Sequence, residues 1–240
     1  MGIIDNTNLD HIRNGEIQSF CGASSVIVIK YKDGVMAIAD TLGSYFSSAR
    51  FTDVRRIKRI GSSALIAASG DIADFQFIAA KLKSKIKKDI RQDDGFALSP
   101  KELFNSASVM MLEKRMDFKP LLNTIVVAGF QDGKSFIGTV DQLGTSYEED
   151  FVATGFGLHM AVPILREEWR PNLTAEEAKN LLEKCARILF YRDSRAMNRF
   201  VIAQLILRND EAECEYHCSK PFSLKTKWDF KGFKEEEYND

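Results

Sequence analysis

The sequence has 240 residues and a mass of 27.1 kDa, which suits one large domain or two small ones, and its 45% hydrophobic content is ample for a buried core. Its 33 basic and 34 acidic residues give a formal net charge of -1, so no field of the whole molecule attracts nucleic acid or a membrane surface. No apolar run approaches the roughly 18 residues of a membrane span, and the N-terminal stretch lacks the basic and apolar regions of a secretory signal.

Two stretches near the start and middle of the chain combine an apolar run, an Asp-Gly pair and a second apolar run. The flanking runs are residues 25–32 and 35–40 around Asp33-Gly34, and residues 121–130 and 135–140 around Asp132-Gly133. Asp-Gly is favoured in the tight turn that joins two antiparallel strands. We therefore predict a β-hairpin at each stretch.

A third short strand, residues 64–69, ends at Gly70, and Asp71 is placed to cap a helix. Apolar residues then recur at three- and four-residue steps and define one helix face: Ile72, Phe75, Ile78, Ala79, Leu82, Ile86 and Ile90. The other side carries Lys81, Lys83, Lys85, Lys87 and Lys88. We interpret these lysines as a solvated helix face, and the alternative is a docking or anion-binding surface.

The next helices are marked by their caps. Ser99-Pro100 opens one whose inward residues are predicted to be Leu103, Ala107 and Met110. A shorter helix is expected between residues 160 and 169, with Pro163 near its first turn.

The clearest helix begins at a capping box of Thr174 and Glu177. Its apolar stripe comprises Ala178, Leu181, Leu182, Cys185, Ile188 and Leu189. A strand over residues 200–207 follows it.

The cysteines at positions 21, 185, 214 and 218 do not form a dense disulfide framework, which favours a reducing compartment. Cys214, His217 and Cys218 could suggest a metal site. However, a structural zinc site needs four close ligands and no fourth is evident, whereas the segment alternates like an edge strand. We predict an edge strand here, and no metal or cofactor.

Hairpin-joined strands with pairs of helices inserted between them predict an α+β fold. In this arrangement two antiparallel sheets pack together and helices cover both outer faces, which gives a four-layer αββα sandwich.

Several separate motifs, in order and spacing, resemble the β subunits of the proteasome: GASSVIVIKYKDGVMAIAD, TLGSYFSSARF, AASGDIADFQF, NTIVVAGFQDGKSFIGTVDQLG and YRDSRAMNRF. The likeness runs from about Gly22 to Phe230. It implies an N-terminal nucleophile (Ntn) hydrolase fold over residues 22–219. Residues 1–21 would then be an N-terminal extension or propeptide, and residues 220–240 a C-terminal arm.

The resemblance also implies where a catalytic site would lie. Catalytic members of the family use an N-terminal threonine, whose hydroxyl attacks the peptide carbonyl while its free amine helps to move the proton. Carried over position by position, the nucleophile falls on Ser24, the catalytic aspartate on Asp40, the catalytic lysine on Arg56 and the oxyanion-hole glycine on Gly70. A glycine before a helix cap also has a plain geometric explanation.

Arg56 and the residue before Ser24 break the catalytic pattern. Ala23 stands where self-cleaving members have glycine, and it tolerates the strained geometry of the acyl shift less well, so we expect no free amine at Ser24. An arginine with a pKa above about 12 cannot shuttle a proton near neutrality, although Arg56 can still pair with Asp40.

A third departure lies in the late motif YRDSRAMNRF. Asp193 matches the second conserved acid of the family, but Ala196 replaces its helper serine and Met197 the glycine that follows. We therefore interpret the hairpin around Asp40 as the scaffold of a site that is kept for shape.

The resemblance implies a structural β subunit of the 20S core particle, and these positions predict that it is non-catalytic. Such a subunit is not an enzyme by itself but contributes to ATP- and ubiquitin-dependent protein degradation by the complex. The implied partners are other α and β subunits in a four-ring particle of twenty-eight subunits, and indirectly its regulatory caps, in cytoplasm and nucleus. Two alternatives are an active peptidase that uses Ser24 after cleavage and a free-standing amidase of the same fold.

The arm is expected to grip neighbouring subunits through Phe222, Trp228, Phe230 and Phe233, which lie beyond the last clear strand.

Overall fold

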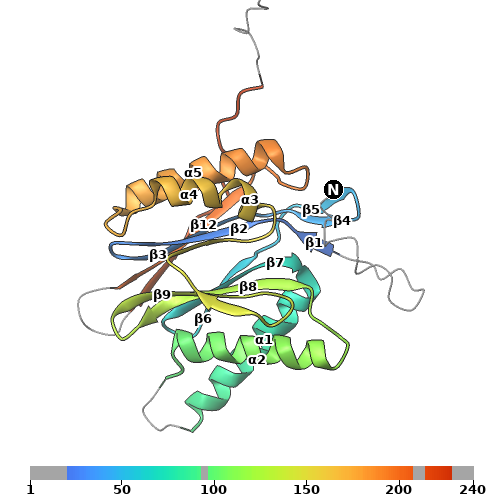
Figure 1. The fold of residues 1–240 in the computed structure, drawn as a ribbon, viewed down its shortest axis with the longest axis vertical. Helices are drawn as coiled ribbons and strands as arrows, with labels where there is room; N and C mark the ends of the chain where they lie inside the picture. The colour runs from blue at the N-terminus through green and yellow to red at the C-terminus, as the bar shows by residue number, and fades with distance from the viewer. Residues whose placement is uncertain (1–20, 93–96, 208–213, 229–240) are drawn as a thin grey trace, which may run out of the picture.

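The computed structural model describes residues 21–92, 97–207 and 214–228. Two antiparallel sheets lie face to face (Figure 1). The larger sheet has the order β10 (Ser146–Glu148), β9 (Lys134–Val140), β8 (Asn123–Gln131), β7 (Ala64–Asp71), β1 (Cys21–Ala23), β4 (Gly43–Tyr45) and β5 (Ser48–Phe51), and β6 (Ile57–Ile60) also pairs with β7. The smaller sheet has the order β11 (Phe151–Ala153), β2 (Val26–Tyr31), β3 (Gly34–Asp40), β12 (Phe200–Leu207) and β13 (Cys214–Cys218).

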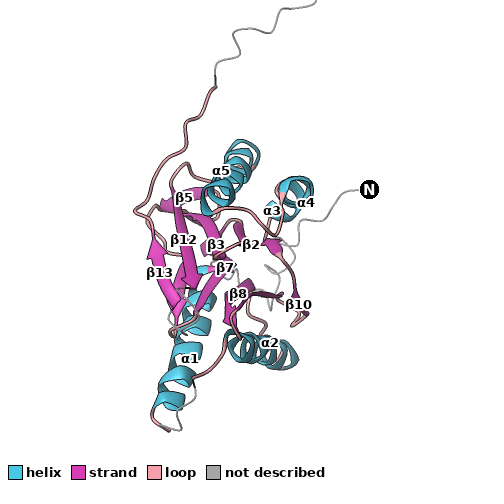
Figure 2. Ribbon diagram, turned by 90° about the vertical axis from the view of Figure 1, so that its left-hand side faces the viewer, coloured by secondary structure: helices cyan, strands magenta, loops and turns pink. Residues whose placement is uncertain are grey.

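Helices cover the outer side of each sheet (Figures 1 and 2). The larger sheet is covered by α1 (Ile72–Ile90) and α2 (Pro100–Met116), and the smaller by α3 (Gly157–Met160), α4 (Val162–Glu168) and α5 (Ala175–Arg192). In the part of the chain that the structure describes, no helix is long and apolar enough to cross a membrane.

Three apolar layers hold these four layers of secondary structure together. Successive side chains of a strand point to opposite faces, so β2 serves two of the layers. Ile27 and Ile29 pack under the helices of the smaller sheet, whereas Val26 and Val28 pack between the two sheets. The third layer, which includes Phe75, lies between the larger sheet and its helices. The αββα prediction is confirmed.

Both predicted hairpins form, but their glycines serve different purposes. Between β8 and β9 the turn residues Asp132 and Gly133 have φ angles of 50° and 74°, as the tight turn requires. Between β2 and β3 the loop is one residue earlier, at Lys32-Asp33, and Gly34 already belongs to β3. A Cβ on Gly34 would lie 2.0 Å from the carbonyl oxygen of Leu205, so close packing against β12 explains this glycine.

The predicted helices are present, with differences at their ends. Asp71 caps α1 by accepting hydrogen bonds from the next helical amides, and the five predicted lysines are exposed. The inward face ends at Leu82: Ile86 is half-buried and Ile90 is 65% exposed, because α1 extends past the sheet (Figure 2). In α2 the fully buried methionine is Met111 rather than Met110.

The segment with the last two cysteines is an edge strand, as predicted. β13 pairs with β12 and lies at the end of the smaller sheet. Because strand side chains alternate, His217 points to the opposite face from Cys214 and Cys218. Among the described residues no three histidine, cysteine or acidic side chains are grouped to hold a metal ion.

The C-terminal segment, residues 219–228, is held against the domain. Phe222 forms a β-bridge with Phe200 and is half-buried rather than exposed. Trp228 packs edge-on against Tyr191 and Phe190, with ring centroids 4.9 and 5.9 Å apart, and remains 59% exposed. Phe230 and Phe233 lie outside the described residues.

Candidate hydrolase site

The residues assigned to the site come from separate elements whose ends meet. Ser24 follows β1, Asp40 is the last residue of β3, and Arg56 directly precedes β6. Gly70 lies near the end of β7, and Asp193 caps the C-terminal end of α5. Hydrogen bonds and an ion pair connect four of these five residues, and the fifth, Gly70, pairs with Ala23 beside Ser24.

Arg56 and Asp40 form a buried ion pair. Their side chains are 1% and 3% exposed, and Nη2 of Arg56 contacts Oδ1 of Asp40. Nε of Arg56 also donates to the Asp40 carbonyl oxygen at 3.1 Å. The pairing that the sequence left open is therefore present.

The remaining contacts of the Arg56 guanidinium go to backbone beneath the candidate nucleophile. Nη1 donates to the carbonyl oxygens of Ser24 and Ser25 at 2.5 and 3.1 Å. Burial lowers the pKa of Arg56 to about 9, against an opposing effect of the Asp193 charge. The guanidinium is still a cation at neutral pH, so it cannot take a proton from Ser24.

The two adjacent serines have different roles in the structure. The Ser24 hydroxyl donates to Oδ2 of Asp193. Oγ of Ser25 is buried and accepts a hydrogen bond from the amide of Gly157 at 2.8 Å, which fixes the start of α3. Of the two serines, only Ser24 therefore remains a candidate nucleophile.

Asp193 and Ala196 belong to one turn after α5. The amide of Ala196 donates to the Asp193 carbonyl oxygen at 3.1 Å, and the amide of Arg195 donates to Oδ1 of Asp193 at 2.9 Å. Ala196 offers the site no hydroxyl, so the Asp193 carboxylate is oriented by backbone alone on this side.

Gly70 is required by the backbone geometry whatever its chemical role. Its φ angle is 99°, and a Cβ would lie 2.0 Å from the carbonyl oxygen of Leu122. Its neighbour across the sheet is Ala23, in β1. This glycine would be needed in a silent subunit as much as in an active one.

Met197 is a partner of the site that sequence reasoning did not identify as one. Its amide donates to Oδ2 of Asp40 at 3.0 Å, across 157 positions of the chain. No side-chain pattern reveals such a bond, because the donor is a backbone group.

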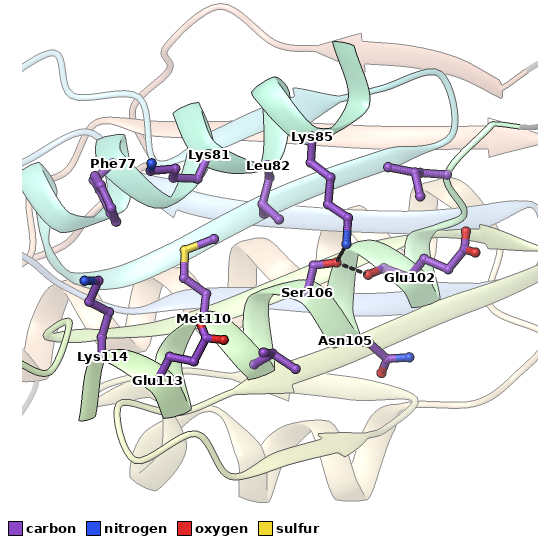
Figure 3. A pocket seen from close by; sticks show the side chains of 12 residues that line it. Phe77, Lys81, Leu82, Lys85, Glu102, Asn105, Ser106, Met110, Glu113 and Lys114 are labelled. Carbon is purple, nitrogen blue, oxygen red and sulfur yellow. Dashed lines mark hydrogen bonds between the residues drawn. The ribbon is translucent and has the colours of Figure 1, made fainter. Parts of the chain in front are cut away.

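A groove of about 680 Å³ lies away from this site, between α1 and α2 (Figure 3). Apolar side chains including Leu82 and Met110 line it, together with Lys81, Lys85 and Lys114. None of the site residues named above belongs to its lining.

Comparison with known proteins supplies the family. The family model described as proteasome subunit matches residues 22–205. The chain belongs to the proteasome subunit family. As a proteasome subunit, it has its place in protein degradation.

The relatives of this proteasome subunit are β subunits. It is 43% identical over 234 residues to proteasome subunit beta type-4 of Arabidopsis thaliana, covering 96% of this chain and 93% of the relative. It is 37% identical over 230 residues to proteasome subunit beta type-4 of Xenopus laevis, covering 90% and 93%. Proteasome subunit beta type-7 of Saccharomyces cerevisiae is 37% identical over 196 residues, covering 78% and 74%. These relatives confirm the resemblance to a proteasome β subunit, of the beta type-4 kind.

Proposed function

We propose that this chain is a non-catalytic, structural β subunit of the 20S proteasome core particle, and no peptidase by itself. The observation that carries the proposal is the buried pair of Arg56 and Asp40, at the positions where active members of the family have lysine and aspartate. A guanidinium that remains a cation, and that spends its donors on Asp40 and on backbone carbonyls, gives Ser24 no base.

The position of β1 supports the same proposal. β1 pairs on one side with β4, where Gly22 faces Ser44, and on the other with β7, where Gly22 faces Asp71. Oγ of Ser44 donates to the Gly22 carbonyl oxygen at 3.1 Å, and the amide of Cys21 donates to Oδ2 of Asp71 at 3.3 Å. An extended peptide binds a sheet through free main-chain groups, and here the chain's own residues occupy them next to Ser24.

The surface of the molecule supports a role in assembly. α2 carries exposed apolar side chains at Val109, Leu112 and Met116, and Phe118 just beyond it is 83% exposed. Val109 also lines the neighbouring groove, and exposed apolar side chains gathered on one helix are typical of protein–protein contacts. We assign it, and the C-terminal arm, to contacts with other α and β subunits of the four-ring particle, to which regulatory caps bind without touching this chain directly.

The proposal includes the division of the chain and its location. Residues 1–21 are an extension or propeptide, residues 22–219 the Ntn-type domain and residues 220–240 the arm. The particle that contains the chain degrades proteins in cytoplasm and nucleus in an ATP- and ubiquitin-dependent manner.

One observation favours a second candidate function, a serine peptidase of the Ntn type. The Ser24 hydroxyl is hydrogen-bonded to the Asp193 carboxylate, so a nucleophile position with an acidic partner is preserved. This function requires cleavage between Ala23 and Ser24, because the base would be the freed amine.

Intact-mass analysis of the chain from purified particles, after treatment with an electrophile that traps N-terminal nucleophiles, separates the two. We expect Gly22 and Ala23 to be retained and Ser24 to remain unmodified, while the catalytic subunits of the same particles take up the probe. A mature N-terminus at Ser24 that carries the adduct would overturn the proposal. Elution as a monomer or dimer on size exclusion, rather than in a large particle, would instead support the free-standing amidase.

A further inference from the structure

One loop lies between the candidate site and the C-terminal segment. This is the 193–199 loop, which connects α5 to β12. The C-terminal segment, residues 219–228, leaves β13 and runs beside α5 (Figure 2). The loop hydrogen-bonds to the site on one side and to this segment on the other.

The site holds the loop at three points. The Ser24 hydroxyl donates to Asp193, and the amide of Met197 donates to Oδ2 of Asp40 at 3.0 Å. The amide of Thr41 donates to the Arg199 carbonyl oxygen at 2.9 Å. Asp40 and Thr41 are 4% and 1% exposed, so the site side of the last two bonds is shielded from water.

The loop in turn holds the C-terminal segment through one side chain. Nδ2 of Asn198 donates to the carbonyl oxygen of Leu224 at 2.8 Å, and the amide of Leu224 donates back to Oδ1 of Asn198 at 2.8 Å. This reciprocal pair binds a backbone unit much as a neighbouring strand would. Leu224 is buried in the apolar layer under the helices of the smaller sheet.

Beyond Leu224 the same segment reaches the end of α5. The amide of Lys227 donates to the Tyr191 hydroxyl at 2.7 Å, and Trp228 then packs on the Tyr191 ring. The segment is thus held at Leu224 by the loop and at Lys227 and Trp228 by the end of α5.

We propose that Asp40 and Arg56 are positioning residues for the C-terminal segment. Arg56 fixes the Asp40 carboxylate, Asp40 fixes the amide of Met197, and the adjacent Asn198 is thereby aimed at Leu224. Loss of a hydrogen-bond donor to a buried carboxylate costs free energy. While the ion pair is intact, the loop is therefore most stable where the Met197 amide reaches Asp40. The inference concerns contacts within one chain and does not rest on the proposed function.

The test is hydrogen exchange of the full-length chain, resolved at the Leu224 amide, together with the rate of tryptic cleavage after Lys225. Asp40→Asn keeps the shape of the side chain but removes its charge, and Asn198→Ala removes the last link directly. We expect each to raise both rates by roughly tenfold, because Asp40→Asn weakens one hydrogen bond to a buried charged group and Asn198→Ala removes two neutral hydrogen bonds. Met111→Ala, in the apolar layer beneath the larger sheet, is the control: it lowers global stability and leaves local opening at Leu224 unchanged.

If Asp40 and Asn198 act through one chain of contacts, their substitutions must not have additive effects. A merely structural role would not require this. The double variant Asp40→Asn/Asn198→Ala should open the segment no more than Asn198→Ala alone, because both changes break one chain of contacts. Arg56→Lys should restore most of the protection that Arg56→Met loses, since it keeps a cation beside Asp40. Parent-level exchange at Leu224 in Asp40→Asn, or additive effects in the double variant, would overturn the proposal. If Asp40→Asn does not fold, the Arg56→Lys and Arg56→Met pair decides it by the same readouts.

Discussion

Arg56 connects several parts of the candidate site through one side chain. Its guanidinium reaches Asp40 and the backbone of Ser24 and Ser25 at the same time. A lysine has a single nitrogen and could not reach all of these acceptors in one geometry. Arginine at this position thus gives the candidate site a set of hydrogen bonds that a lysine would not make.

The first prediction concerns the energy of this pair. Arg56→Met should lower the free energy of unfolding by about 3 to 5 kcal/mol, because it leaves the buried Asp40 carboxylate without a counter-charge. Chemical denaturation of the full-length chain measures it. Arg199→Met is the matched control: Arg199 pairs with Asp53 at 3.3 Å on the surface, and its loss should cost less than about 1 kcal/mol. Equal losses would contradict the role given to burial.

The second prediction separates backbone conformation from close packing at Gly70. Gly133→Ala meets positive φ with no atom within 4 Å, so it should cost about 1 to 2 kcal/mol. Gly70→Ala meets positive φ and also the carbonyl oxygen of Leu122 at 2.0 Å, so its cost in unfolding free energy should be clearly larger. A thermal or denaturant melt of both variants measures the difference, and similar midpoints would show that the strands move apart easily here.

At the scale of elements, the Asp71 side chain connects β1 to α1 by hydrogen bonds. One carboxylate oxygen caps α1 by accepting from Ala73 and Asp74 at 2.7 and 3.0 Å, and the other accepts from the amide of Cys21 in β1 at 3.3 Å. The residue that begins the helix therefore also helps to keep β1 in the sheet. Helix capping was predictable from the sequence, and the second contact was not.

The third prediction concerns α5, whose buried face includes Cys185. Burial raises the pKa of this thiol from 9.0 to about 12. Between these values the unfolded chain releases the proton and the folded chain keeps it, so the stability contributed by the neutral thiol is full below pH 9 and declines as the pH rises toward 12. Unfolding midpoints across this range should fall less steeply in Cys185→Ala than in the parent. A slope in Cys185→Ala as steep as the parent's would contradict this prediction.

At the scale of the whole molecule, the two outer helical faces differ in whether another segment of the chain packs on them. The face with α5 is joined by the C-terminal segment, whose Leu224 is buried, whereas α2 leaves apolar side chains such as Met116 exposed. The four layers of the fold are thus all present, but apolar side chains on its outer surface remain exposed. This is the expected state of a subunit taken out of its assembly.

The fourth prediction addresses the arm. A chain truncated after Lys220 should accumulate as half-particles that join slowly, because it lacks Leu224 and the aromatic residues beyond it. A chain truncated after Lys234, which lacks only the acidic end, is the control and should assemble as the parent does. Native gel electrophoresis of particles from cells that carry each variant measures the ratio, and normal yields of full particles from the shorter chain would contradict the arm's role.

What the sequence determined by itself is local. The cap of α1 and its apolar face as far as Leu82, the capping box of α5 and the Asp132-Gly133 turn depend on residues a few positions apart, and they formed where predicted. The positions assigned to the candidate site came from the resemblance that short motifs carry, and their role stays a prediction. Strands as short as β1, β4, β6 and β10 were missed, because three or four residues carry too little periodicity.

Tertiary structure decided what those positions do. Arg56 reaches Asp40 across 16 positions, Met197 reaches Asp40 across 157, and Asn198 reaches Leu224 across 26. Each of these bonds has a backbone amide or carbonyl group as donor or acceptor, and because nearly every residue carries both groups, no residue type indicates them. Only the packing of the two sheets brings these groups together, and it joins the candidate site, the 193–199 loop and the C-terminal segment by hydrogen bonds.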